Sequence, residues 1–183
     1  MITPPYLQSG DKVGIVSTAK TVSAAEIEEG LNIVKSWNLE PVVGKNAHNV
    51  FGFFAGTDQE RLEDLQKMLD DDTIKAVIFT RGGYGTIKFI DQLDFTNFKK
   101  NPKWIVGYSD ITVLHSHIHN LEIETLHAVM LQGMPSATPE SVASLKSALF
   151  GESLTYEIAK NDKNKHGETT VEGTLDELEL TDL

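Results

Sequence analysis

The 183-residue chain contains no cysteine, which excludes disulfide bonds, thiol nucleophiles and cysteine metal ligands. It has no apolar run of about 18 residues, the length that a membrane-spanning helix requires. Its first residues lack the basic and apolar stretches of a secretory signal. Basic residues are also scarce: the chain has 16 lysines and arginines and 27 acidic residues, which gives a net charge of −11. This negative charge argues against nucleic acid or an anionic membrane as the partner. The lack of cysteine fits a reducing compartment but does not establish one.

The acidic residues are unevenly distributed along the chain. Residues 151–183 contain nine acidic residues and three lysines, so that this short stretch carries about half of the net charge. The rest of the chain is long enough to form one domain with a proper hydrophobic core. We therefore expect a globular domain over residues 1–150 and a segment of a different kind over residues 151–183.

Short apolar runs rich in β-branched residues alternate with segments of helical periodicity. This alternation predicts βαβ units, and hence a Rossmann-like or flavodoxin-like α/β fold with a parallel sheet and helices on both of its faces. The expected strands are Lys12–Ser17, Glu40–Val43, Lys75–Thr80, Trp104–Val106 and Glu124–Leu126.

Capping boxes predict two helix starts, at Ser23–Glu26 and Thr57–Glu60. In each box the hydroxyl accepts a hydrogen bond from the backbone N–H of the glutamate, and the glutamate side chain accepts one from the backbone N–H of the hydroxyl residue. A third helix begins at Thr138, with proline at its first position, and runs to about Phe150. The remaining expected elements are a helix from the glycines near 85 through Ile90, a helix from Ser109 to Leu121, and two strands, Leu154–Ala159 and Thr169–Leu175, which would form a short carboxy-terminal β extension.

The stretch Lys103–Thr112 has the pattern of a strand, a sharp turn and a helix, with Ser109 at the turn. This is the arrangement of a nucleophile elbow, which lifts a serine hydroxyl clear of the sheet. The first amides of the following helix can then stabilise an oxyanion. The pattern is imperfect, because Ile111 stands where the second glycine of G-x-S-x-G is expected. A serine that caps an ordinary helix is the alternative interpretation.

The glycine-rich segment Arg81–Gly85 follows the expected strand Lys75–Thr80 and has three interpretations. The glycines can serve the turn alone, by adopting positive φ. Their backbone can also approach a ligand and complete an oxyanion hole together with the Asp110 amide. The third interpretation is a loop that binds phosphate, but the segment matches neither G-x-G-x-x-G nor a P-loop.

Several polar segments follow the carboxyl ends of the expected strands. In a parallel sheet these ends meet at one edge, where ligands bind. The segments that we expect to meet there are Ser17-Thr18, Arg81–Gly85, Ser109 and His127.

The histidines of this sequence do not predict a metal site. His115 and His119 are spaced as neighbours on one helix face, but His117 points the other way and no carboxylate completes a zinc motif. We interpret them as partly exposed residues on a helix flank. His127 ends a strand at the expected ligand edge, where it can act as a base for Ser109 or hold a loop by a local hydrogen bond.

Taken together, the ordered motifs resemble the amino-terminal half of the LD-carboxypeptidase family, which includes murein tetrapeptide carboxypeptidases and microcin immunity peptidases. The resemblance extends from about Gly10 to Gly173. It rests on Ala55–Asp58 with Arg61, Asp64-Leu65, Asp72, Ile74–Ala76, Arg81–Gly85, Leu93-Asp94, Asn101–Lys103 and Gly107–Thr112.

The resemblance implies a serine peptidase in which Ser109 is the nucleophile and the amides of Asp110 and Gly83 form the oxyanion hole. The substrate would be a small peptide ending in a D-amino acid, such as a murein tetrapeptide. Members of the family use no metal or cofactor, are mostly cytoplasmic, and often form homodimers. Residues near these positions are candidates for contacts with the substrate: Gly82, Tyr84, Tyr108 and His127.

The family's catalytic glutamate and histidine lie in a carboxy-terminal domain that this sequence does not contain. Residues 151–183 would be a linker and the start, or a replaced remnant, of that domain, because Val171–Leu175 resembles its first strand while Asp176–Leu180 replaces the usual glycine-containing turn. We therefore expect the 183-residue chain to be inactive by itself. The alternative is a non-catalytic domain of the same fold that binds a peptide or self-associates.

Overall fold

The computed structural model describes residues 1–154. Their centre is a five-stranded sheet in which all neighbouring strands run parallel, in the order β2-β1-β3-β4-β5. This is the flavodoxin-like order, in which the chain reverses its direction of winding between β1 and β3. The strands are β1 (Lys12–Val16), β2 (Glu40–Val43), β3 (Ile74–Phe79), β4 (Trp104–Gly107) and β5 (Leu126–His127).

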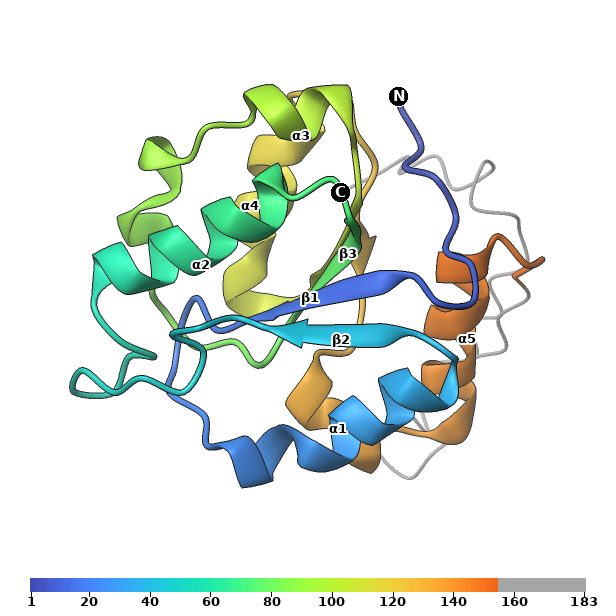
Figure 1. Cartoon of the computed structure of the whole chain (residues 1–183), viewed down its shortest axis with the longest axis horizontal. Helices are drawn as coiled ribbons and strands as arrows, with labels where there is room; N and C mark the ends of the chain where they lie inside the picture. Colours follow the sequence, from blue (N-terminus) through green and yellow to red (C-terminus); the bar gives the residue numbers. More distant parts are fainter. Residues whose placement is uncertain (155–183) are drawn as a thin grey trace, which may run out of the picture.

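Helices cover both faces of this sheet (Figure 1), and each face has its own hydrophobic core. The side chains of β3 alternate between the cores: Val77 and Phe79 pack against α2, α3 and α4, whereas Ala76 and Ile78 face α1 and α5. The α-helices are α1 (Ala24–Ser36), α2 (Asp58–Asp70), α3 (Thr96–Lys100), α4 (Thr112–His119) and α5 (Pro139–Phe150), and the 3₁₀ helices are η1 (Thr86–Lys88), η2 (Ile90–Gln92), η3 (Ser109–Ile111) and η4 (Leu131–Ser136).

The structure confirms the expected α/β fold with its parallel sheet. Both capping boxes are formed, by Ser23 with Glu26 before α1 and by Thr57 with Glu60 before α2. The helix at Thr138 ends at Phe150, where Gly151 adopts a left-handed conformation.

Two predicted elements are wrong in detail. The segment after Gly85 forms the short helices η1 and η2 instead of one α-helix, because Phe89, between them, has a φ of −135° that breaks the helical path. The fifth strand lies at Leu126–His127 instead of Glu124–Leu126, since it pairs only with the last two residues of β4. The short helices α3 and η4 have no counterpart among the predicted elements.

The predicted β extension lies outside the described residues except for Leu154, and so does most of the segment 151–183. Among residues 1–154, no helix is both long and apolar enough to cross a bilayer.

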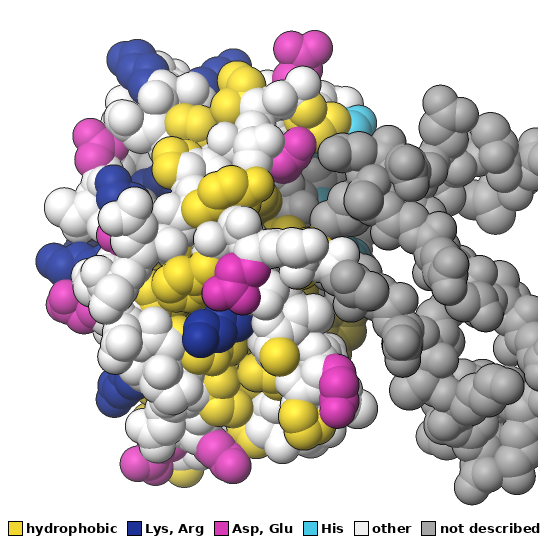
Figure 2. Space-filling model, turned by 90° about the vertical axis from the view of Figure 1, so that its right-hand side faces the viewer, with side chains coloured by type: hydrophobic (Ala, Val, Ile, Leu, Met, Phe, Trp, Pro, Cys, Tyr) yellow, Lys and Arg dark blue, Asp and Glu magenta, His cyan; other side chains and the backbone are white. Residues whose placement is uncertain are grey.

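The edge of the sheet at which the strands begin carries charges of both signs. Figure 2 shows this edge, where acidic and basic side chains are interspersed with apolar ones. A cavity of about 350 Å³ lies there, lined by residues that precede β1, β3 and β4 and by the first two residues of β3. Its charged lining residues are Asp11, Asp72, Lys75 and Lys100.

Candidate active site

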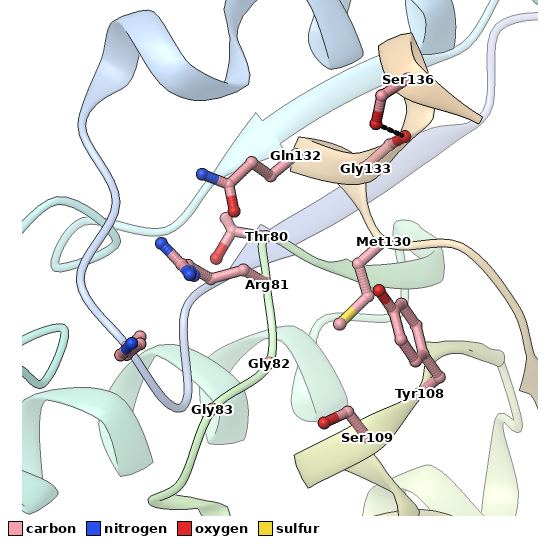
Figure 3. A pocket seen from close by; sticks show the side chains of 11 residues that line it. Thr80, Arg81, Gly82, Gly83, Tyr108, Ser109, Met130, Gln132, Gly133 and Ser136 are labelled. Carbon is pink, nitrogen blue, oxygen red and sulfur yellow. Dashed lines mark hydrogen bonds between the residues drawn. The ribbon is translucent and has the colours of Figure 1, made fainter.

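A cavity of about 440 Å³ lies at the opposite edge, where the strands end (Figure 3). Its walls come from the segments that follow β1, β3, β4 and β5, as the parallel topology predicts. It is lined by Lys20, Thr80, Arg81, Gly82, Gly83, Tyr108, Ser109, Met130, Gln132, Gly133 and Ser136.

Ser109 occupies the sharp turn between β4 and the helical segment η3–α4. Its φ is +61°, in the left-handed region that a serine rarely adopts. The turn is so tight that a side chain at Gly107 would collide with Ile111, because a Cβ there would lie 2.9 Å from the Ile111 Cγ1. Ser109 itself is exposed and lines the cavity. A positive φ at a serine between a strand and a helix fits the expected nucleophile elbow, although the second glycine is missing. We call this turn, residues 107–111, the elbow.

The glycine segment after β3 passes directly in front of this serine. A Cβ at Gly82 would lie 3.1 Å from the Ser109 Cβ and 3.2 Å from its Oγ, so any side chain at position 82 would crowd the hydroxyl. The next residue, Gly83, has a φ of +139°. The sequence-predicted residues Gly82, Gly83 and Ser109 are therefore brought together in one place.

Asp110 ties the glycine segment to the elbow through its carboxylate. Oδ1 accepts a hydrogen bond from the Gly85 N–H at 3.1 Å, and Oδ2 accepts bonds from the Thr86 N–H at 3.1 Å and the Thr86 hydroxyl at 2.7 Å. Thr86 also hydrogen-bonds Thr18 after β1, at 2.8 Å. The side chain of Asp110 thus fixes the spacing between two backbone segments, which sequence reasoning did not predict.

His115 is a structural residue of the elbow. Its ring nitrogens hydrogen-bond the Gly107 carbonyl at 2.9 Å and the Thr125 hydroxyl at 2.8 Å, so it links the end of β4 to the segment before β5. Burial lowers the pKa of His115, and nearby His127 adds to the lowering, while the bond to the Gly107 carbonyl opposes it. His115 therefore connects two backbone segments, and its intermediate exposure agrees with the expected position on a helix flank.

The lowered pKa of His115 predicts a pH dependence of stability. As the pH falls through about 6.5, the unfolded chain takes up the proton before the folded one, so the free energy of unfolding falls. Carboxylates whose pKa is lowered, such as Glu26 and Asp94, change the free energy of unfolding with pH only below about pH 4.5. Between pH 7 and 5, chemical denaturation should show a smaller loss of stability in His115→Gln than in the wild type. If the free energy of unfolding fell equally with pH in the two proteins, this prediction would be contradicted.

Of the remaining predicted substrate contacts, Tyr108 lines the cavity, and Tyr84 and His127 are not among its lining residues. Tyr84 is 53% exposed and packs near the Phe54 ring, at a centroid distance of 6.4 Å. His127 is exposed, with its ring 6.1 Å from that of Tyr108. Within residues 1–154 the His127 ring forms no hydrogen bond, and the Ser109 hydroxyl has no hydrogen-bonded base. This part of the chain also contains no group of three or more metal-ligating side chains.

Sequence reasoning missed several residues of the cavity wall. Their positions in the sequence could have identified them, because each residue follows the carboxyl end of a strand, as Lys20 does after β1. The segment after β5 was overlooked because η4 was not predicted; its backbone reaches β3 through a bond from the Gln132 N–H to the Thr80 carbonyl at 2.9 Å. The missed residues are Lys20, Thr80, Met130, Gln132, Gly133 and Ser136, whereas Arg81 belongs to the glycine segment that was expected at this edge.

Comparison with known families decides the classification of this arrangement. The LD-carboxypeptidase N-terminal domain matches residues 13–128, which include the elbow and the glycine segment. The chain belongs to the LD-carboxypeptidase family. The resemblance inferred from the sequence motifs is thereby confirmed.

Other members of the LD-carboxypeptidase family are recognisably similar in sequence. A probable murein peptide carboxypeptidase of Bacillus subtilis (strain 168) is 37% identical over 157 residues, which cover 84% of this chain and 49% of the relative. A murein tetrapeptide carboxypeptidase of Pseudomonas aeruginosa is 28% identical over 90% of this chain and 56% of the relative. The chain thus spans about half the length of these relatives.

Two solved structures share the fold of this chain. Microcin C7 self-immunity protein MccF in complex with aspartyl sulfamoyl adenosine superimposes with a TM-score of 0.79, at 20% identity, over 95% of this chain and 56% of that protein. An MccF-like protein from Bacillus anthracis str. Ames gives a TM-score of 0.76 at 23% identity, over 81% of this chain and 47% of that protein.

Proposed function

We propose that this chain carries the nucleophile half of a murein peptide carboxypeptidase. The observation that supports this most directly is the positive φ of Ser109 at the end of β4, which presents its hydroxyl to the glycine segment. Strained backbone of this kind costs about 1–3 kcal/mol and is concentrated at functional sites. A serine that merely capped a helix would have no need of it.

In this mechanism the Ser109 Oγ attacks the carbonyl carbon that precedes the terminal D-amino acid. The Asp110 and Gly83 N–H groups stabilise the oxyanion that develops. The hydroxyl proton passes through a base to the departing amine as the C–N bond breaks, and water then hydrolyses the acyl-enzyme. The family resemblance implies a histidine supported by a glutamate as the base, and we place both outside the 183 residues of this chain. The chain alone would then release no D-alanine at a steady rate.

A fluorophosphonate reagent, which modifies activated serines, tests the proposal on the chain itself. We expect slow modification at Ser109, located by peptide mass spectrometry, and none at Ser136, the other serine of the cavity. Ser109→Ala should remove the labelling and Ser136→Ala should leave it unchanged. Modification of neither serine, with retained binding of a peptide, would instead support a non-catalytic peptide-binding domain.

Two parts of this proposal concern the whole protein. A cytoplasmic location is implied by the family resemblance, and the absence of cysteine is compatible with it. Self-association, whether as a homodimer or through a surface that another domain would cover, predicts that the elution volume in gel filtration depends on protein concentration. An elution volume that is constant at the size of a monomer would argue against self-association.

A further inference from the structure

The cavity beside Ser109 has a charge opposite to that of the chain. The net charge of the sequence is −11, yet the two charged side chains that line this cavity, Lys20 and Arg81, are both basic. The cavity at the other edge of the sheet is lined by charges of both signs. A purely basic lining in an acidic chain is suited to an anionic ligand.

Arg81 is held in this cavity without a partner for part of its guanidinium. The side chain extends from the end of β3 into the cavity, on the same side as Gln132 (Figure 3). Its Nε is buried and has no hydrogen-bond partner among residues 1–154. A buried donor without an acceptor is costly, so an oxygen supplied by a ligand would stabilise this position.

A carboxylate near Arg81 belongs to Glu26, in the first turn of α1: hydrogen bonds from Ser23 and, to a smaller extent, the positive charge of Arg81 lower the pKa of Glu26. Both of its oxygens are already engaged by other groups. Oε2 accepts bonds from the Ser23 N–H and hydroxyl, each at 2.8 Å, and Oε1 accepts a bond from the Gln132 Nε2 at 3.0 Å. The ion pairs of the described residues join Asp58 to Arg61 and Lys88, and Arg81 takes part in none of them. Its charge therefore remains available to a ligand.

Lys20 adds a second positive charge next to the glycine segment. A Cβ at Gly83 would lie 3.1 Å from the Lys20 Cγ, so the stem of this lysine runs along the backbone of Gly83. Lys20 is exposed, and a hydrated ammonium group attracts an anion without fixing its orientation. The planar guanidinium of Arg81 can instead bind both oxygens of a carboxylate at once.

We propose that Arg81 binds the terminal carboxylate of the peptide, with Lys20 contributing attraction over a longer distance. The identity of the ligand as a peptide rests on the proposed function. A peptide whose carboxyl group is amidated, or continues into a further residue, would lose this interaction. Arg81 would thus select for cleavage at the carboxyl terminus over cleavage within a chain.

The test is an NMR titration of the ¹⁵N-labelled 183-residue chain. The ligands are Nα,Nε-diacetyl-L-lysyl-D-alanine and its carboxy-terminal amide, which differ only at the terminal carboxylate. We expect the free acid to bind about tenfold more tightly than the amide or better. Arg81→Gln should bind both ligands alike, and Arg81→Lys, which keeps the charge but not the planar fork, should retain part of the preference.

The matched control is Lys67→Gln, which removes one positive charge from the exposed surface of α2 and should retain the full preference. The inference is overturned if the wild type binds acid and amide equally or binds neither, or if Arg81→Gln retains the preference for the acid. Fluorophosphonate labelling of Ser109 requires no carboxylate. Labelling without a preference for the acid would therefore refute this inference alone, and a preference without labelling would refute only the hydrolytic function.

Discussion

Asp110→Ala is expected to lower the rate of fluorophosphonate labelling at Ser109 by about 100- to 1,000-fold, the effect of losing one oxyanion donor. The carboxylate accepts three hydrogen bonds from Gly85 and Thr86 and thereby holds the glycine segment against the elbow. Without it these donors lose their acceptor, and the glycine segment that contains Gly83, the proposed second oxyanion donor, is no longer held against the elbow. The amide of residue 110 itself remains, so the loss arises from positioning.

Thr86→Val provides the graded comparison for this effect. It removes one of the three bonds and keeps the two backbone bonds, so its effect should be smaller than that of Asp110→Ala. The double variant should be little slower than Asp110→Ala alone, because both changes break the same linkage. Asp91→Ala, at an exposed position of η2, is the matched control and should label at the wild-type rate. A normal labelling rate in Asp110→Ala, with the fold verified by thermal unfolding, would contradict the proposed linkage.

Arg61→Ala is expected to lower the free energy of unfolding by about 3 to 5 kcal/mol. The side chain is fully buried beneath the site, where it pairs with Asp58 and donates a bond from Nη1 to the Thr18 carbonyl at 2.6 Å. Its guanidinium lies 4.7 Å from the Phe54 ring centroid and 5.2 Å from that of Phe89. Truncation would leave a cavity between the two rings and a buried carbonyl without its donor.

Urea denaturation measures this loss, and Arg61→Met separates its two causes. Methionine fills much of the volume but donates no hydrogen bond, so we expect a loss of about 1 to 3 kcal/mol, the cost of the unsatisfied carbonyl. Asp58→Ala should cost less than about 1 kcal/mol, because that carboxylate is 41% exposed and screened by water. If Arg61→Ala were as stable as the wild type, Arg61 would not be a structural support of the site.

Sequence patterns sufficed for the parts of the fold that local chemistry determines. The capping boxes at Ser23 and Thr57 involve residues three positions apart, so the starts of α1 and α2 could be predicted. The buried apolar runs gave the first four strands to within one or two residues. The meeting of Arg81–Gly85 with Ser109 followed from parallel topology, which the alternation of strands and helices determines.

The details that could not be predicted depend on contacts between distant residues. The bonds of Asp110 reach back 24 and 25 positions, and nothing in the local sequence shows whether that carboxylate faces solvent or the backbone of Gly85. The register of β5 is set by its pairing with Val106 and Gly107, and not by its own apolar residues. Arg81 looked like part of a glycine turn, because the lack of a partner for its Nε is visible only in three dimensions.

No short stretch of this chain contains the whole lining of the cavity next to Ser109. Its lining begins at Lys20 and ends at Ser136, and the intervening wall is assembled from the connections of four separate strands. A peptide containing the elbow alone would have the serine without its surroundings. The reactivity of that hydroxyl is therefore a reporter of the complete tertiary structure, and it should vanish when the sheet comes apart even though the local sequence is intact.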